Sequence, residues 1–163
     1  MPNHVANDLT VKGPKADLTK FVAGIKTPEK GSKSILDSYL PVPSDLMVTV
    51  SIPPSANEKS KAVSNRKKYG STNWYDWCLK NYGTKWGDYD LEITERSNSV
   101  FCNFNSAWSP PIEGLQTVSK QFPTLSFSLK FFEGAMGFQG HYIFKNGKIV
   151  SKVDAKYSGR RGG

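Results

Sequence analysis

The residues of this chain that could do chemistry are two histidines, two cysteines and a few carboxylates in predicted loops. A two-histidine phosphodiesterase needs two His-x-Ser/Thr motifs, and neither His4 nor His141 has Ser or Thr two positions later. The sequence contains no Gly-x-Ser-x-Gly elbow, no Walker A motif and no dinucleotide fingerprint. The histidines, Cys78 and Cys102 lie too far apart in the sequence for a zinc-binding spacing. We therefore predict a non-enzymatic protein with no catalytic residue, no metal and no cofactor.

Three loop carboxylates form the next candidate for chemistry. Glu133 could face Asp88 and Asp90, and such a cluster would serve acid–base catalysis or hold a divalent cation. The alternative is that each carboxylate accepts hydrogen bonds from backbone N–H groups or pairs with a lysine. We favour this alternative, because no further segment repeats a metal-ligand spacing.

Two tryptophans at the ends of predicted elements indicate a pocket for a ligand or a partner. Their rings could stack on a base or anchor a protein surface. The competing interpretation is that both rings cap the core where two helices meet the sheet edge. The residues predicted for this pocket are Trp86, Asp88, Tyr89, Asp90, Trp108, Ser109 and Glu133.

A second candidate surface lies near the C-terminus. Segment 137–144 partly resembles the aromatic strand of an RNA-recognition motif, although Met136 stands where that motif has a basic residue. Lys148 and Lys152 share strand parity and are predicted to line one face. Core packing of the aromatics, and lysines that protect an exposed strand edge, are the competing interpretations. The residues predicted to bind nucleic acid or an acidic surface are Lys145, Lys148, Lys152, Phe138, Tyr142 and Phe144.

Composition sets the class of protein within which these candidates must fit. The chain has 163 residues, of which 37% are hydrophobic, and this is enough for one domain with a real core. Its longest apolar runs are too short to cross a bilayer, and its N-terminus does not resemble a secretory signal. The net charge of +8 favours partners that are rich in phosphate or acidic. Cys78 and Cys102 are predicted to be buried free thiols, which points weakly to a reducing compartment.

The order of predicted elements favours an α+β fold of the ferredoxin-like type. Helices are expected between Pro14 and Thr27, over 73–82 behind a Ser71-Thr72 cap, and up to Phe122 behind a Ser109 cap. The predicted strands cover 4–11, 91–95, 100–104, 125–131, 138–144 and 148–153. Leaving out the short helix over 73–82, this order is βαββαβ with helices on one face, followed by a terminal hairpin turned at 146–147.

The predicted domain spans residues 1–155 and contains one long irregular segment. Residues 28–70 hold many Pro, Ser and Lys residues and few periodic apolar positions, which predicts an insertion after the first helix. Within it, 46–52 could form a short strand. Residues 156–163 are predicted to be a flexible basic tail.

Four phrases, in order along the chain, resemble the Api92-like/YubB family. They lie at residues 1–11, 73–90, 104–111 and 132–140, and the most specific are Trp86-Gly87-Asp88-Tyr89-Asp90 and Ala107-Trp108-Ser109-Pro110-Pro111. The resemblance implies a ferredoxin-like domain of the kind found in phage and conjugative-plasmid genes. It also implies the cytoplasm of a bacterial host, and it supplies no catalytic residues.

These observations lead us to expect a non-enzymatic accessory protein of a phage or plasmid that binds a host macromolecule. The partner would be a host protein or a nucleoprotein complex, and inhibition of a CRISPR-type complex is a specific hypothesis of counter-defence. A pull-down from host lysate that recovers no stoichiometric partner would reject it. One alternative is an RNA-recognition-motif-like protein that binds single-stranded nucleic acid, and another is a pocket that sequesters a nucleotide.

Overall fold

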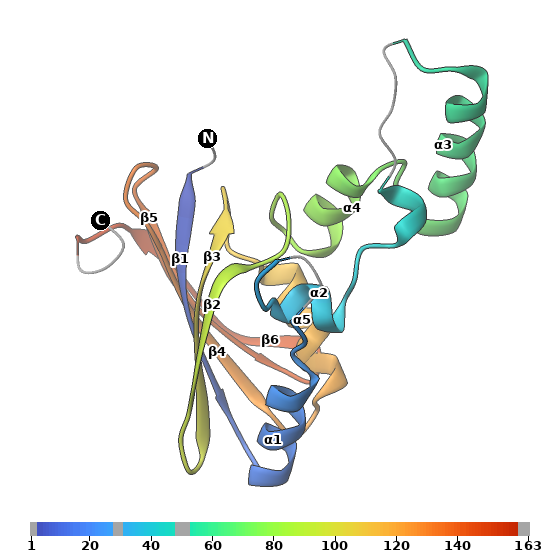
Figure 1. The fold of residues 1–163 in the computed structure, drawn as a ribbon. Helices are drawn as coiled ribbons and strands as arrows, with labels where there is room; N and C mark the ends of the chain where they lie inside the picture. The colour runs from blue at the N-terminus through green and yellow to red at the C-terminus, as the bar shows by residue number, and fades with distance from the viewer. Residues whose placement is uncertain (1–2, 28–30, 48–52, 160–163) are drawn as a thin grey trace.

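The computed structural model describes residues 3–27, 31–47 and 53–159, and these form one antiparallel sheet with helices on one side of it (Figure 1). The strands are β1 (His4–Lys12), β2 (Tyr89–Glu95), β3 (Ser99–Ala107), β4 (Ser126–Glu133), β5 (Phe138–Lys145) and β6 (Lys148–Lys156). The helices are α1 (Lys15–Gly24), α2 (Ile35–Tyr39), the 3₁₀ helix η1 (Ser44–Leu46), α3 (Ala56–Tyr69), α4 (Trp74–Asn81) and α5 (Ile112–Gln121).

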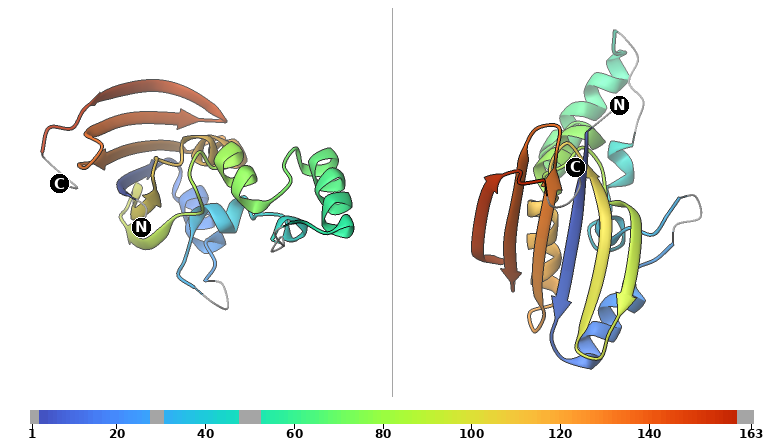
Figure 2. Two further views of the ribbon diagram at one scale, coloured as in Figure 1. Left: turned by 90° about the horizontal axis from the view of Figure 1, so that it is seen from above. Right: turned by 90° about the vertical axis from the view of Figure 1, so that its left-hand side faces the viewer.

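The topology confirms the predicted ferredoxin-like α+β fold. The sheet order is β2-β3-β1-β4-β5-β6, so the first strand lies between β3 and β4 in the middle of the ferredoxin-like part. Helix α1 leads out of β1, and α5 joins β3 to β4. The β5–β6 hairpin then extends the sheet beyond β4, as Figure 2 shows.

The core fills the space between the sheet and the helices on its covered face. Along β4, Phe127, Leu129 and Phe131 are buried toward the helices, whereas Lys130 points to the opposite face and is exposed. Phe21 of α1 packs edge-on against Phe127, with ring centroids 5.5 Å apart. This confirms the alternation predicted for 125–131. The other face of the sheet carries no helix in the described part of the chain (Figure 2).

Residues 28–70 are more regular than predicted, because α2, η1 and α3 form within them. Helix α3 starts at a capping box between Ser55 and Glu58 and ends at Gly70, whose φ of 71° is the left-handed conformation that glycine adopts easily. The sequence prediction failed because α3 consists mostly of charged and polar residues and lacks a continuous apolar stripe. Residues 28–30 and 48–52 lie outside the described ranges, and so does most of the strand predicted over 46–52.

Two predicted helix caps are wrong by a few residues. Helix α4 is capped by Asn73, whose side chain accepts from the backbone N–H of Asp76 at 2.9 Å, and not by Ser71 or Thr72. Ser109 does not cap α5; its hydroxyl donates to the carbonyl of Gly83 at 2.5 Å. Helix α5 begins after Pro111 without a side-chain cap.

The remaining sequence predictions concern the hairpin, the tail and the cysteines. Positive φ angles at Asn146 (47°) and Gly147 (75°) confirm the two-residue turn of the hairpin. Strand β6 continues to Lys156, and 160–163 lie beyond the described residues. Cys78 and Cys102 are buried and free, as predicted. No helix in the described part of the chain is long and apolar enough to cross a membrane.

Candidate nucleic-acid interface on the open face of the sheet

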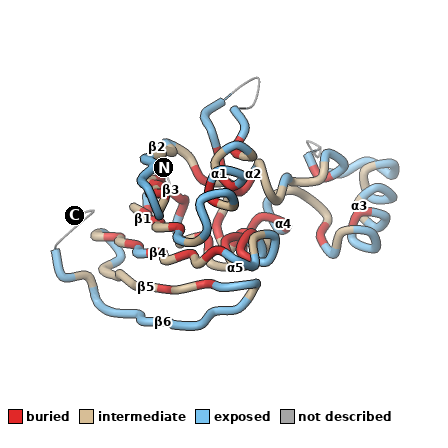
Figure 3. The backbone as a smooth tube through the Cα atoms, turned by 90° about the horizontal axis from the view of Figure 1, so that it is seen from below, coloured by how far each residue is buried: buried red, intermediate tan, exposed pale blue. Residues whose placement is uncertain are grey.

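In the described part of the chain, one face of the six-stranded sheet carries no helix (Figure 2). Because side chains alternate along a strand, every second residue of each strand points to this open face. Strand β6, at the end of the sheet, is exposed along its whole length (Figure 3). The described parts of α1, α2 and α5 pack only on the opposite side (Figure 2).

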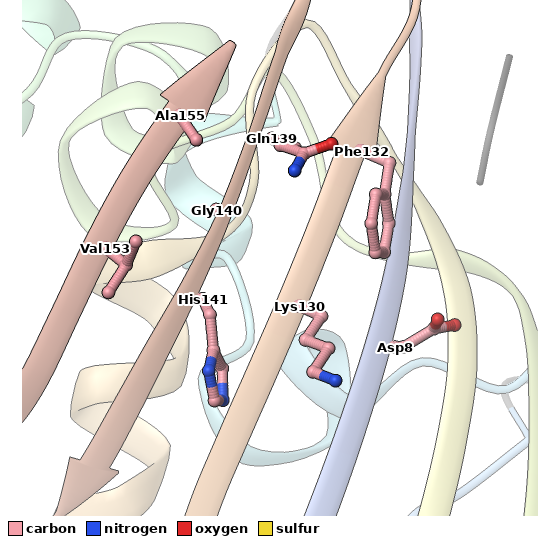
Figure 4. Close-up of a pocket in the computed structure, with 8 residues that line it drawn as sticks. All are labelled: Asp8, Lys130, Phe132, Gln139, Gly140, His141, Val153 and Ala155. Atoms are coloured by element: carbon pink, nitrogen blue, oxygen red, sulfur yellow. The ribbon is translucent and has the colours of Figure 1, made fainter. Parts of the chain in front are cut away.

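Two adjoining hollows lie on this open face. The larger has a volume of about 460 Å³ and is drawn in Figure 4; it is lined by Asp8, Lys130, Phe132, Gln139, Gly140, His141, Val153 and Ala155. The smaller has a volume of about 220 Å³ and is lined by Asp8, Thr10, Phe101, Asn103, Ser128 and Lys130. Asp8 and Lys130, direct cross-strand partners on β1 and β4, border both hollows.

Polar side chains around this shared border are held by short hydrogen bonds. The Asn103 amide donates to Asp8 Oδ1 at 2.6 Å. The Ser128 hydroxyl lies 2.7 Å from Nε2 of His141. Burial, with a contribution from nearby Lys130, lowers the pKa of His141, which favours the neutral imidazole. These groups therefore offer both hydrogen-bond donors and acceptors to a ligand, beside the ammonium of Lys130.

Each hollow also has one phenylalanine ring on its border. Phe132 belongs to the larger hollow and Phe101 to the smaller, and both rings are partly exposed. The guanidinium of Arg96 lies 4.5 Å from the centroid of the Phe101 ring. Strand spacing and rise place the two phenylalanines roughly 16 Å apart across the sheet. The open face thus presents two aromatic platforms with a cation between them.

The sequence analysis missed every residue of these hollows, although it contained one usable signal. In segment 125–131 the buried residues alternate with Ser and Lys, and the next residue on the polar face is Phe132. Single exposed aromatic residues are common on protein surfaces, so Phe132 gains meaning only together with the other residues of the open face. Phe101 and His141 carry no comparable signal, because only the strand register shows that their side chains point to the open face of the sheet.

Asp88, which was predicted to line a pocket, is buried instead and supports helix α2. Its carboxylate accepts from the Ser34 hydroxyl at 2.8 Å and from the backbone N–H groups of Ile35 and Leu36 at 2.9 and 2.8 Å. Burial raises the pKa of Asp88 against the lowering effect of these hydrogen bonds. The alternative in which the carboxylate accepts from backbone donors is confirmed, although the donors belong to α2 rather than to the loop of Asp88.

Glu133 is also buried and bonded within its own turn. Its carboxylate accepts from the backbone N–H groups of Ala135, at 3.1 Å, and Met136. The favoured interpretation, in which loop carboxylates accept from backbone N–H groups, is therefore confirmed for Asp88 and Glu133, and these two do not form the alternative carboxylate cluster. In the part of the chain that the structure describes, no three His, Cys, Asp or Glu side chains are grouped to hold a metal ion.

Three other residues of the predicted pocket, Tyr89, Asp90 and Trp86, each contact a neighbouring side chain. The Tyr89 hydroxyl lies 2.5 Å from His4 Nδ1, and Asp90 accepts from the Asn105 amide at 3.1 Å. The ammonium of Lys85 lies 4.9 Å from the centroid of the Trp86 ring. Trp108 is 48% exposed, so it does not cap the core as the competing interpretation held.

The aromatic residues predicted to stack bases face the wrong side of the sheet. Strand β5 pairs with β4 so that Phe138, Tyr142 and Phe144 point toward the helices, where Phe144 is fully buried and Tyr142 nearly so. The Tyr142 hydroxyl donates to Asp154 at 2.8 Å. The core interpretation of this strand is therefore correct, and the resemblance to an RNA-binding strand at these positions is wrong.

A bulge separates the lysines that were predicted to share a face. The β5–β6 register shifts between Ile143 and Phe144, which leaves one extra residue on β6. Lys148 consequently pairs with Lys145, an open-face position, whereas Lys152 lies on the helix side. There Lys152 forms an ion pair of 3.4 Å with Asp154.

The comparisons with known proteins agree with this fold. Residues 81–161 match the family model described as a ferredoxin-like domain in Api92-like proteins. This part of the chain is therefore similar to the ferredoxin-like domain of Api92-like proteins, in agreement with the resemblance seen in the sequence.

A solved structure extends the likeness to nearly the whole chain. The crystal structure of the protein api92 from Yersinia pseudotuberculosis aligns with a TM-score of 0.59 over 97% of this chain and 99% of that one. The two sequences are 12% identical, so this likeness shows the fold alone. No curated protein matches the sequence.

Proposed function

We propose that the protein binds single-stranded nucleic acid on the open face of its sheet, without a reaction of its own. The observation that carries this proposal is the placement of Lys130 between two hollows that each hold a phenylalanine ring. Aromatic rings stack on bases of any sequence, and lysines beside them bind the phosphates that join those bases. The net charge of +8 supports the same class of ligand.

The polar groups of the hollows suit the edges of bases. The Gln139 amide oxygen accepts from the backbone N–H and the hydroxyl of Ser158 at 3.0 and 3.2 Å, so its NH₂ group is left as a donor, and the carboxylate of Asp8 accepts only. RNA-recognition motifs bind two or three bases on the open face of a βαββαβ sheet. The proposed site lies on the same face. Its stacking rings are Phe101 and Phe132, and not the aromatic residues of segment 137–144.

Substituting Phe132 by alanine tests the proposal directly. Because each stacked base contributes about 1–3 kcal/mol, we expect Phe132→Ala to bind a labelled oligonucleotide of about twelve nucleotides roughly 5- to 150-fold more weakly. Fluorescence anisotropy at two salt concentrations measures this. Tyr75→Ala removes an exposed aromatic ring from α4 and serves as the control. Equal affinities of the two variants, or no binding by the wild type at low salt, would reject the proposal.

The binding should also depend on pH through His141. Since the pKa of His141 is lowered from 6.5, its imidazole gains a proton only below that pH, and a nearby phosphate favours the protonated form. We expect affinity for the oligonucleotide to rise severalfold between about pH 7.5 and 5.5. His141→Gln should remove this rise, whereas His4→Gln should keep it. A rise that survives in His141→Gln contradicts the assignment.

The biological setting proposed for this activity rests on the resemblance to phage and plasmid proteins. In that setting the bound strand would belong to a host nucleic acid or nucleoprotein complex, and counter-defence is one form of the proposal. The pull-down from host lysate described above tests it. Failure to recover a nucleoprotein would reject the setting and leave the oligonucleotide measurements to decide the binding activity.

A further inference from the structure

Helix α3 stands away from the sheet and is held mainly by one aspartate. Figure 1 shows α3 at the far end of the helical side, beyond α4. The Asn65 amide donates to the backbone carbonyl of Asp45 at 3.1 Å. Lys68 and the Tyr69 hydroxyl bind the Asp45 carboxylate at 3.0 and 2.6 Å. One face of α3 is thus used to hold the helix against η1.

A different face of α3 borders an apolar hollow of about 480 Å³. Lys59, Ala62, Val63 and Arg66 line it from the helix, and Thr72 lines it from the connection to α4. Val63 is 72% exposed, a high value for a β-branched apolar residue. The described residues provide no salt bridge for Lys59 or Arg66. This face therefore combines an apolar centre with a cation at each end.

We infer that this α3 face docks an acidic, leucine-containing peptide segment of a protein partner. Lys59 and Arg66 are seven residues apart, which is two helical turns or about 10.5 Å. A helical partner that carries carboxylates two turns apart, with an apolar side chain between them, matches both cations and the hollow. Protein interfaces have this arrangement, in which an apolar centre is surrounded by a charged rim.

The positive charge of α3 favours a negatively charged partner, and the apolar residues of the hollow favour a peptide over a nucleic acid. Helix α3 carries five Lys or Arg residues and one Glu, so an acidic ligand is attracted. A nucleic-acid backbone would use the cations but would leave Val63 and Ala62 against a charged, hydrated surface. A peptide uses both. The face is built from α3 and the connection to α4, so it is separate from the hollows of the open sheet face.

A labelled peptide tests this inference. The probe is a fluorescein-labelled peptide about four helical turns long, with leucines at every third or fourth position and glutamates between them. We expect it to bind the full chain, and Arg66→Glu to weaken binding about tenfold in fluorescence anisotropy. Lys67→Glu is the matched control, because it makes the same charge change on the next residue of the helix without lining the hollow. It should change the affinity less than about twofold.

Val63→Ala provides a second variant that should keep the helix, since alanine favours helices more than valine does. We expect it to weaken the leucine peptide severalfold and to leave a peptide with serine in place of leucine unaffected. Circular dichroism and oligonucleotide binding check that both variants remain folded. Equal effects of Arg66→Glu and Lys67→Glu would overturn the inference. Equal binding of the two peptides would also overturn it, as would binding at this face of duplex DNA and not of the leucine peptide.

Discussion

Replacing Asp88 by alanine is expected to destabilise the protein by about 3 kcal/mol. The substitution removes the acceptor of three hydrogen bonds at the start of α2 and leaves the backbone N–H groups of Ile35 and Leu36 buried without a partner. Relief of the desolvation that raises the pKa of Asp88 offsets only part of this loss. Urea unfolding measures the change in free energy, and a fall in melting temperature of roughly 6–12 °C should accompany it.

Asp90 supplies the control for that experiment. It is a carboxylate two residues along the same segment, but it is exposed and accepts from one side-chain amide, that of Asn105. Its φ of 54° is a conformation that asparagine adopts readily, so the control substitution is Asp90→Asn. This change should cost less than about 0.5 kcal/mol. Similar losses for Asp88→Ala and Asp90→Asn would show that the hydrogen bonds to α2 do not hold the insertion to the domain.

Replacing Gly140 by valine is expected to cost about 3 kcal/mol as well, by overpacking the sheet. A Cβ atom at this position would meet the ring of Phe131 and would come within 2.8 Å of the backbone carbonyl oxygen of Val153. The ring could rotate away, but the carbonyl belongs to the neighbouring strand and can move only if the β5–β6 pairing changes. Because Gly140 also lines the larger hollow, distortion of this pairing should weaken oligonucleotide binding.

Ser151→Val is the matched control for Gly140→Val. Ser151 lies on β6, is exposed, and belongs to a strand, where valine is a favourable residue. It should change the free energy of unfolding by less than about 0.5 kcal/mol. Urea unfolding of both variants checks the pair, and a Gly140→Val variant as stable as Ser151→Val would show that Phe131 and β6 accommodate the added side chain.

The parts of the fold that the sequence predicts are those with strong local patterns. The alternation of Phe127, Leu129 and Phe131 with polar residues defines β4, and Asn146-Gly147 defines the last turn. Helix α3 was missed, although its capping box and terminal glycine are visible in the sequence, because the segment around it has the composition of an irregular loop. In this insertion the capping box and the terminal glycine therefore predict the helix better than the composition does.

The candidate site was harder to predict because it depends on strand register. Phe138, Tyr142 and Phe144 have the spacing of a base-stacking strand, and only the pairing of β5 with β4 shows that they face the core. The bulge that separates Lys148 from Lys152 has no clear sequence signature. The hollows join residues from β1, β3, β4, β5 and β6, and no pattern within one segment could bring these together.

The central position of β1 has a consequence for how the chain folds. Lys12 pairs with Ser99 and Ala6 pairs with Phe132, so both partner strands of β1 lie about ninety residues or more later in the chain. Contacts this distant in sequence slow folding, because a long loop must close before they form. β1 can pair with β3 only after residues 99–107 have been synthesised, and its second edge stays unpaired until β4 follows.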